Sequence, residues 1–177
     1  MTQEYGKVAK LLHWGMAVCL IAMVGLGKYM EDAPLDAFTY FLYDTHKAIG
    51  VTLLGLAIFR FVCRFVVPPP TMIVNDIPPW QLWLAKGVHI GIYILMIIVP
   101  LSGWIASSAT GFPMTYFGLM PILPIVPSDK MISDIGFEIH EIAVNLLIIL
   151  FFLHLAGALK HHFINRDDTL RRMLPRR

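Results

Sequence analysis

Four long stretches almost without charge constrain this sequence more than any other feature. A helix needs roughly 20 mostly apolar residues to cross the hydrocarbon core of a bilayer. The chain offers such stretches as spans at about 8–30, 46–67, 84–108 and 137–162. They are continuous and do not alternate between apolar and polar residues, so they do not fit barrel strands. We therefore expect an all-α integral membrane four-helix bundle, with residues 1–177 forming one domain.

Composition agrees with a chain that lives among lipids. Hydrophobic residues make up 57% of it and charged residues 15%, against about 25% charged in soluble domains. The first span lacks the small-residue cleavage site of a signal peptide, so we expect it to be retained. Cys19 and Cys63 fall inside predicted spans, where we expect no disulfide framework.

The basic residues predict the orientation. An even number of spans puts both termini and the connection between the second and third spans on one side. By our assignment that side holds 11 of the 14 lysines and arginines, and the other side holds only Lys28, Lys47 and Lys130. Because cytoplasmic segments carry the excess of Lys and Arg, we expect both termini in the cytoplasm of a bacterium, with the chain in its inner membrane. This asymmetry accounts for the basic side without a nucleic-acid partner.

Histidines supply the chemistry, because an ionisable residue within a bilayer is a functional candidate. His140 and His154 lie fourteen residues apart on the fourth span. At about 100° and 1.5 Å per residue they return to nearly the same helix face, about 21 Å apart along the axis. One helix thus offers a ligand near each membrane surface, as two prosthetic groups stacked through the bilayer require.

Partners for these two histidines follow from depth. His46 opens the second span at the outer side, level with His140, and His13 lies just inside the first span, level with His154. Facing helices of a bundle are where haem is held, and Gly50 and Gly157 leave room for a flat macrocycle. The sequence predicts two haem sites, with iron ligated by His46 and His140 and by His13 and His154.

Other readings of the histidines remain open. His89 on the third span fits either a hydrogen-bonded residue of the bundle interior or a group with a haem- or quinone-related role. Zinc prefers a tetrahedral cluster, which pairs at separate depths do not supply. A proton-relay transporter would carry acidic residues in mid-membrane, and none lies deeper than Glu141. Covalent haem is excluded because no Cys-x-x-Cys-His run exists.

Motifs along nearly the whole chain resemble the bacterial cytochrome b561 family. The matching pieces are Leu12-His13-Trp14, His46-Lys47-x-x-Gly50 with Arg60 and Arg64, His89 with Tyr93, Pro100, Gly103 and Trp104, His140-Glu141, His154, Lys160-His161-His162-Phe163, and Asp168-Thr169-Leu170-x-Arg172-Met173-x-Pro175-Arg176. The resemblance implies two non-covalent haems b on His13, His46, His140 and His154, and a quinone bound at the cytoplasmic side.

Two axial histidines leave no iron site for oxygen, so we expect one-electron transfer rather than oxygen binding. Haem propionates carry negative charge and need cations; Arg60 is our choice as their partner, with Arg64 next. Plain anchoring at the basic side explains both arginines equally well.

His161 keeps the helix face of His154, about two turns closer to the cytoplasm. We expect it to act as the catalytic proton donor to ubiquinone, because histidine exchanges protons near neutral pH. His162 points elsewhere and should matter less. Interfacial anchoring beside Lys160 is the competing interpretation.

The electron donor is the least constrained feature. Among relatives suggested by length and tail motif, the superoxide oxidases pass electrons from superoxide to ubiquinone, which would make the chain an enzyme. Related four-helix subunits instead relay electrons from a redox partner protein in hydrogenase or dehydrogenase complexes. Eight acidic residues on the predicted outer side disfavour an anionic substrate. A third possibility is a non-redox haem-binding anchor or sensor.

Overall fold

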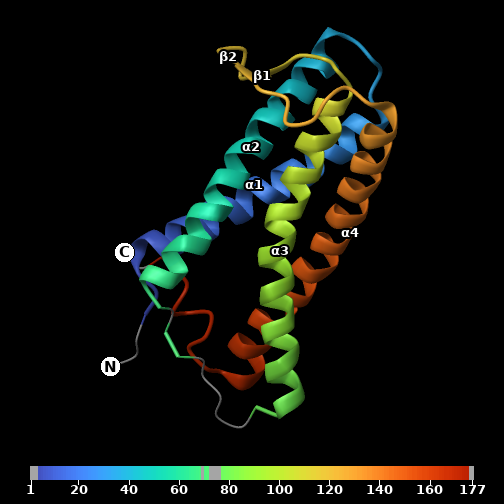
Figure 1. Cartoon of the computed structure of the whole chain (residues 1–177). Helices are drawn as coiled ribbons and strands as arrows, with labels where there is room; N and C mark the ends of the chain where they lie inside the picture. The colour runs from blue at the N-terminus through green and yellow to red at the C-terminus, as the bar shows by residue number, and fades with distance from the viewer. Residues whose placement is uncertain (1–3, 69, 72–76, 176–177) are drawn as a thin grey trace.

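The structure is a computed structural model that describes residues 4–68, 70–71 and 77–175. Within them the chain forms four long helices, a short hairpin and a terminal turn (Figure 1). In chain order these are α1 (Lys7–Asp32), α2 (Ala37–Val66), α3 (Pro79–Ala109), β1 (Met114–Tyr116), β2 (Met120–Ile122), α4 (Lys130–Lys160) and the π-helical turn η1 (His161–Asn165).

All four helices are long and apolar enough to cross a membrane, with α4 and η1 together forming the last candidate span. The predicted all-α membrane bundle is therefore confirmed. Two ends can be defined. The hairpin end holds the 33–36 connection and the β1–β2 hairpin, and the tail end holds both termini and segment 166–175.

Three helices begin earlier than the predicted spans. Asp36 starts α2 by accepting a 2.8 Å hydrogen bond from the Thr39 amide, and Asp129 starts α4 through the Ile132 amide at 3.0 Å. In α3, Pro79 occupies the first helical position, where proline's missing N–H is no loss. His46 therefore lies more than two turns inside α2, not at its start as we expected. Hydropathy detects only the apolar part of a helix, so polar first turns escape it.

The closest helix pair is α3 and α4, which run side by side (Figure 1). A Cβ on Gly136 would lie 2.9 Å from Ala106 Cβ, and one on Gly91 would lie 2.6 Å from a Leu150 methyl. Small residues let membrane helices approach closely, because packing and not hydrophobicity joins them in lipid. On the other side of α3, a methionine-rich cluster joins it to α1 and α2 through Met16, Met23, Leu53, Ala57 and Met96.

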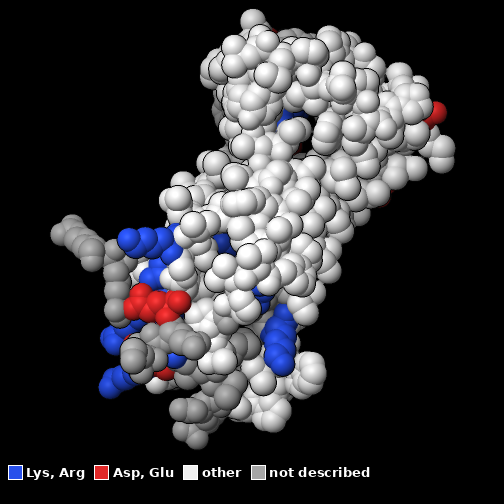
Figure 2. All heavy atoms as spheres, turned by 60° about the vertical axis from the view of Figure 1, so that its left-hand side comes forward, with Lys and Arg blue, Asp and Glu red and all other residues white. Residues whose placement is uncertain are grey.

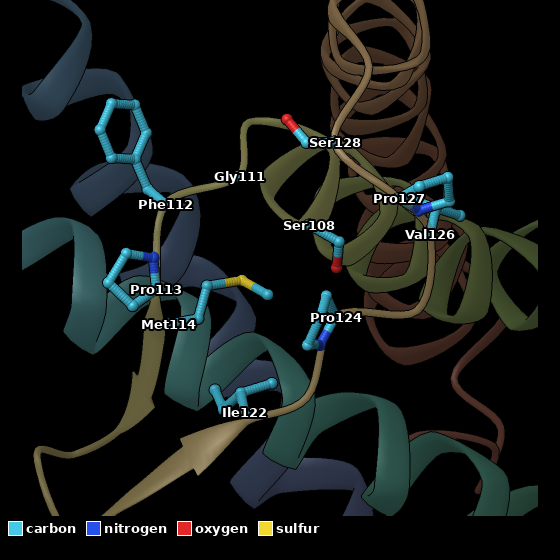
Figure 3. Close-up of a pocket in the computed structure, with 10 residues that line it drawn as sticks. All are labelled: Ser108, Gly111, Phe112, Pro113, Met114, Ile122, Pro124, Val126, Pro127 and Ser128. Carbon is cyan, nitrogen blue, oxygen red and sulfur yellow. The ribbon is translucent and has the colours of Figure 1, made fainter.

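The segment between α3 and α4 folds over the hairpin end. Antiparallel β1 and β2 pair Met114 with Ile122, and the Tyr116 hydroxyl lies 3.0 Å from the Thr52 hydroxyl on α2. A mostly apolar pocket lies beneath this segment, with Met114 and Pro124 among its lining side chains (Figure 3). The hairpin end is thus covered partly by strand.

Segment 166–175 folds back across the tail end and is tied to α1. The Trp14 indole donates a 2.9 Å hydrogen bond to the Met173 carbonyl, and the buried Lys10 ammonium donates to the Leu174 carbonyl at 3.0 Å. Arg172 bonds the Thr71 carbonyl at 3.0 Å. Lysines and arginines gather in the lower half of the face shown in Figure 2, which includes this end, whereas the upper half is almost free of charged side chains. The charge asymmetry expected from the sequence is therefore present.

Candidate functional site

Four of the histidines form two pairs at different levels of the bundle. At the hairpin end, the rings of His46 on α2 and His140 on α4 have centroids 6.3 Å apart. Toward the tail end, His13 on α1 and His154 on α4 have centroids 6.1 Å apart. The structure thus brings together the same pairs that the depth argument predicts.

Both separations suit a shared metal. With metal–imidazole nitrogen bonds of about 2.0 Å, two rings on opposite sides of one metal would have centroids about 6 Å apart. His89 also lies beside His154, but its centroid is only 5.1 Å away, which is too short for that arrangement. The geometry therefore favours His13 over His89 as the partner of His154.

The α3 backbone holds His140 in an orientation suited to ligation. Its Nδ1 lies 2.7 Å from the Val99 carbonyl oxygen. A carbonyl only accepts, so Nδ1 carries the proton and Nε2 presents its lone pair. Metal-binding histidines usually donate their second N–H in this way. A Cβ on Gly103 would lie 3.0 Å from the same Nδ1, so this glycine makes room for the ring.

Open space beside the pairs supports the fit to a flat group. A Cβ on Gly50, one turn beyond His46, would meet no described atom within 4 Å, and Gly157 is equally open. His46 Nδ1 is buried and has no hydrogen-bond partner among the described residues. The four histidines and the open space beside them would therefore fit two haems, each held by one histidine pair.

The predicted propionate partners lie near the tail-end pair. Arg60 donates to the Ala9 carbonyl at 3.0 Å and has a second nitrogen 3.5 Å from His13 Nδ1. Its guanidinium keeps further N–H groups for an anion. Arg64 instead reaches Tyr93, with its guanidinium 5.4 Å from the ring centroid and a 3.4 Å contact to the hydroxyl. Arg60 is thus the better placed of the two.

His161 lies at the end of α4, where it forms a close pair with a carboxylate. Its Nδ1 is 2.6 Å from Asp167 Oδ2. Burial alone would raise the pKa of the Asp167 carboxyl, but hydrogen bonds from His161 and Thr169 hold that pKa below its ordinary value. His162 makes an edge contact with Phe163, and its buried Nδ1 has no partner in the described chain.

Several supporting residues escaped sequence reasoning. Asp167, Ser102 and the carbonyls of Val99 and Met173 become neighbours of the histidines or of α1 only through folding. One local signal was available for Asp167, which follows His161 by six residues just past a helix end. The backbone carbonyls carry no residue-type signal at all.

Comparisons with known proteins agree with this arrangement. The family described as Prokaryotic cytochrome b561 matches residues 4–176. "Cytochrome b561 homolog 2" of Escherichia coli K12 is 30% identical over 173 residues, covering 97% of this chain and 92% of its own length. "Cytochrome b561 homolog 1" of the same strain is 30% identical over 185 residues, covering 98% of each chain. "Probable superoxide oxidase CybB" of Yersinia pestis is 26% identical, covering 100% of this chain and 99% of its own.

Four apolar helices with facing histidines at two levels define a class of membrane protein that holds prosthetic groups inside a helical bundle. The family match extends that description over nearly the whole chain. The chain belongs to the prokaryotic cytochrome b561 family, and it is therefore a bacterial membrane protein that binds b-type haem.

Proposed function

We propose that this chain is a di-haem cytochrome b that passes electrons from superoxide, at the hairpin end, to ubiquinone, at the tail end. The proposal rests on the two histidine pairs, which lie at two levels of the bundle. Their ring centroids are 6.3 and 6.1 Å apart. When bound, each haem would supply reversible one-electron transfer. His46 and His140 would hold one, and His13 and His154 the other.

The overall reaction balances with two superoxide anions per quinone. Each superoxide loses one electron and becomes dioxygen, and the quinone gains two electrons and two protons to become quinol. Superoxide as donor is supported by the likeness to the Yersinia pestis relative, whose printed name is probable superoxide oxidase. The tail end would face the cytoplasm, because it holds the excess of lysine and arginine.

The residues of this chain would manage protons and charge at the quinone. His161 has one nitrogen engaged by Asp167, which leaves Nε2 for the substrate oxygen. Lys160 lies beside it but is engaged by Gln81 at 2.9 Å and Asn165 at 3.2 Å. The contact with Gln81 ties the end of α4 to α3. Arg60, with N–H groups to spare, would neutralise a propionate of the tail-end haem.

Stopped-flow absorption of the purified holoprotein tests this proposal. Superoxide should reduce the haem bands within the mixing experiment, and added ubiquinone should reoxidise them with one quinol formed per two electrons. His161→Gln should keep both haems and their reduction while slowing reoxidation on the order of 100-fold, the usual contribution of a general acid. Haems that superoxide leaves oxidised would contradict the proposed donor, and unchanged reoxidation in His161→Gln would move the quinone elsewhere.

A second function, electron relay from a docked redox protein, is favoured by one observation at the hairpin end. All three lysines there pair with a carboxylate on their own helix: Lys28 with Glu31 at 2.8 Å, Lys47 with Asp44 at 3.6 Å and Lys130 with Asp134 at 2.6 Å. These pairs weaken any positive field that would draw in superoxide. Co-purification of a redox subunit from the native membrane, together with no reduction by superoxide, would select this alternative.

A further inference from the structure

The end of α4 reverses direction in a way that carries a carboxylate back onto His161. The last helical turn widens into η1, and Arg166 then adopts a left-handed backbone with φ 54° and ψ 36°. A non-glycine residue in that region is uncommon, and π-helical turns occur frequently at functional sites. As a result, the Asp167 amide donates a 3.1 Å hydrogen bond to the carbonyl of His161.

The side chain of Asp167 is held as firmly as its backbone. Oδ1 accepts a 2.8 Å hydrogen bond from the Thr169 amide, which leaves Oδ2 for His161 at 2.6 Å. The two paired side chains are mostly buried, with 21% and 17% of their surfaces exposed for His161 and Asp167. The carboxylate is therefore fixed before any substrate arrives.

This contact selects one tautomer of the imidazole. A carboxylate oxygen at 2.6 Å would repel a lone pair on Nδ1, so Nδ1 must carry the proton. Asn165 and the Thr169 hydroxyl also approach Nδ1, but at 3.4 and 3.5 Å. Because Nδ1 carries a single proton, that proton points to Asp167, the nearest acceptor. The hydrogen bonds that the ring makes to described residues all involve Nδ1, so Nε2 has no hydrogen-bond partner among them.

We propose that Asp167 is a positioning residue that holds His161 in its Nδ1–H form, with Nε2 presented to the oxygen of a bound quinone. This inference rests on the proposed function, because it assigns a task within the same quinone site. The quinone contacts His161, and Asp167 acts only through that ring. For each transfer, Nε2 first takes up a proton from water at the tail end, then passes it to the reduced quinone, and the ring returns to its Nδ1–H form.

The first experiment measures the tautomer and needs no quinone. Holoprotein with ¹⁵N-labelled histidine, chemically reduced so that its low-spin iron is diamagnetic, gives long-range ¹H–¹⁵N spectra in which His161 is assigned by its loss in His161→Gln. Wild type should show the Nδ1–H form. Asp167→Ala should show a mixture dominated by the other tautomer, and Asp167→Glu should restore part of the Nδ1–H signal.

The second experiment measures haem reoxidation by ubiquinone in the same variants. Orienting partners of functional histidines in metal sites are typically worth 10–100-fold, so Asp167→Ala should slow the maximum rate by about that factor with both haems retained. Asp168→Ala is the matched control, since Asp168 is adjacent but pairs on the surface with Arg171 at 3.4 Å. It should leave both the tautomer and the rate unchanged.

The outcomes separate the two proposals. An unaltered tautomer in Asp167→Ala, or a slowed rate that Asp168→Ala reproduces, overturns the positioning role alone. A changed tautomer with normal reoxidation in both Asp167→Ala and His161→Gln overturns the quinone site, and the positioning role falls with it. Loss of haem or of thermal stability in Asp167→Ala, with the Nδ1–H form kept, would mean that Asp167 only holds the tail in place.

Discussion

The two histidine pairs differ in how the protein holds their rings. His140 is fixed by the Val99 carbonyl at 2.7 Å, whereas His46 Nδ1 is buried without a partner in the described chain. His13 has the Arg60 guanidinium 3.5 Å from its ring, and a positive group there would favour reduction of an iron bound by His13. We therefore expect the two haems to have different potentials.

Replacing each histidine should identify its haem. His46→Ala or His140→Ala should remove the haem of the hairpin end, and His13→Ala or His154→Ala that of the tail end, because a buried imidazole has no substitute ligand in hydrocarbon. Pyridine haemochrome assays should fall from two haems per chain to about one. His89→Ala is the control and should keep two. Loss of a haem in His89→Ala, with none in His13→Ala, would reverse the assignment.

Gly103 offers a test that leaves every ligand in place. A Cβ there would lie 3.0 Å from His140 Nδ1, so Gly103→Val should push the ring away from the Val99 carbonyl. We expect loss of the hairpin-end haem while the tail-end haem stays bound, as judged by the haem content and redox titration. Gly25→Val, at an exposed position of α1 with no described neighbour within 4 Å of an added Cβ, should keep both haems.

Among the elements, α3 and α4 depend on contact between small residues. A Cβ on Gly136 would lie 3.0 Å from the Cα and 2.9 Å from the Cβ of Ala106. Both distances are too short for a non-bonded contact, and a helix backbone cannot move aside as a flexible side chain can. Gly136→Val should lower the stability of the bundle by about 1–3 kcal/mol, the usual effect of overpacking. Thermal unfolding in detergent measures it. Ala156→Val on the exposed face of α4 is the matched control and should be near neutral.

The elements also show what sequence alone can predict. Long apolar runs and the fourteen-residue spacing of His140 and His154 report on one helix at a time, so helix number and histidine depth were predictable. The start of α2 at Ala37 depends on a capping bond from Asp36, which hydropathy does not register. The Asp167 contact depends on a left-handed Arg166, and L-residues adopt that backbone too rarely for a pattern to indicate it.

For the whole molecule, the shared tail end leads to a prediction of membrane orientation. Both termini lie at the end where basic residues gather, and such ends stay in the cytoplasm. Green fluorescent protein fused to either terminus should fluoresce, and alkaline phosphatase fused there should stay inactive. A fusion of the phosphatase within the 117–119 turn should be active. Fluorescence from only one terminus would contradict an even number of spans.

The strap formed by segment 166–175 bears on how the protein is made. Trp14 and Lys10 donate hydrogen bonds to carbonyls that lie 159 and 164 positions further along the chain. The first helix therefore enters the membrane long before the ribosome has synthesised the residues that secure its end. Until then, α1 is held in register by its packing against α2 and α3 and by the hydrogen bond from Arg60 to the Ala9 carbonyl. A chain that terminates before segment 166–175 is therefore expected to hold α1, and the His13 ring on it, less firmly in the bilayer.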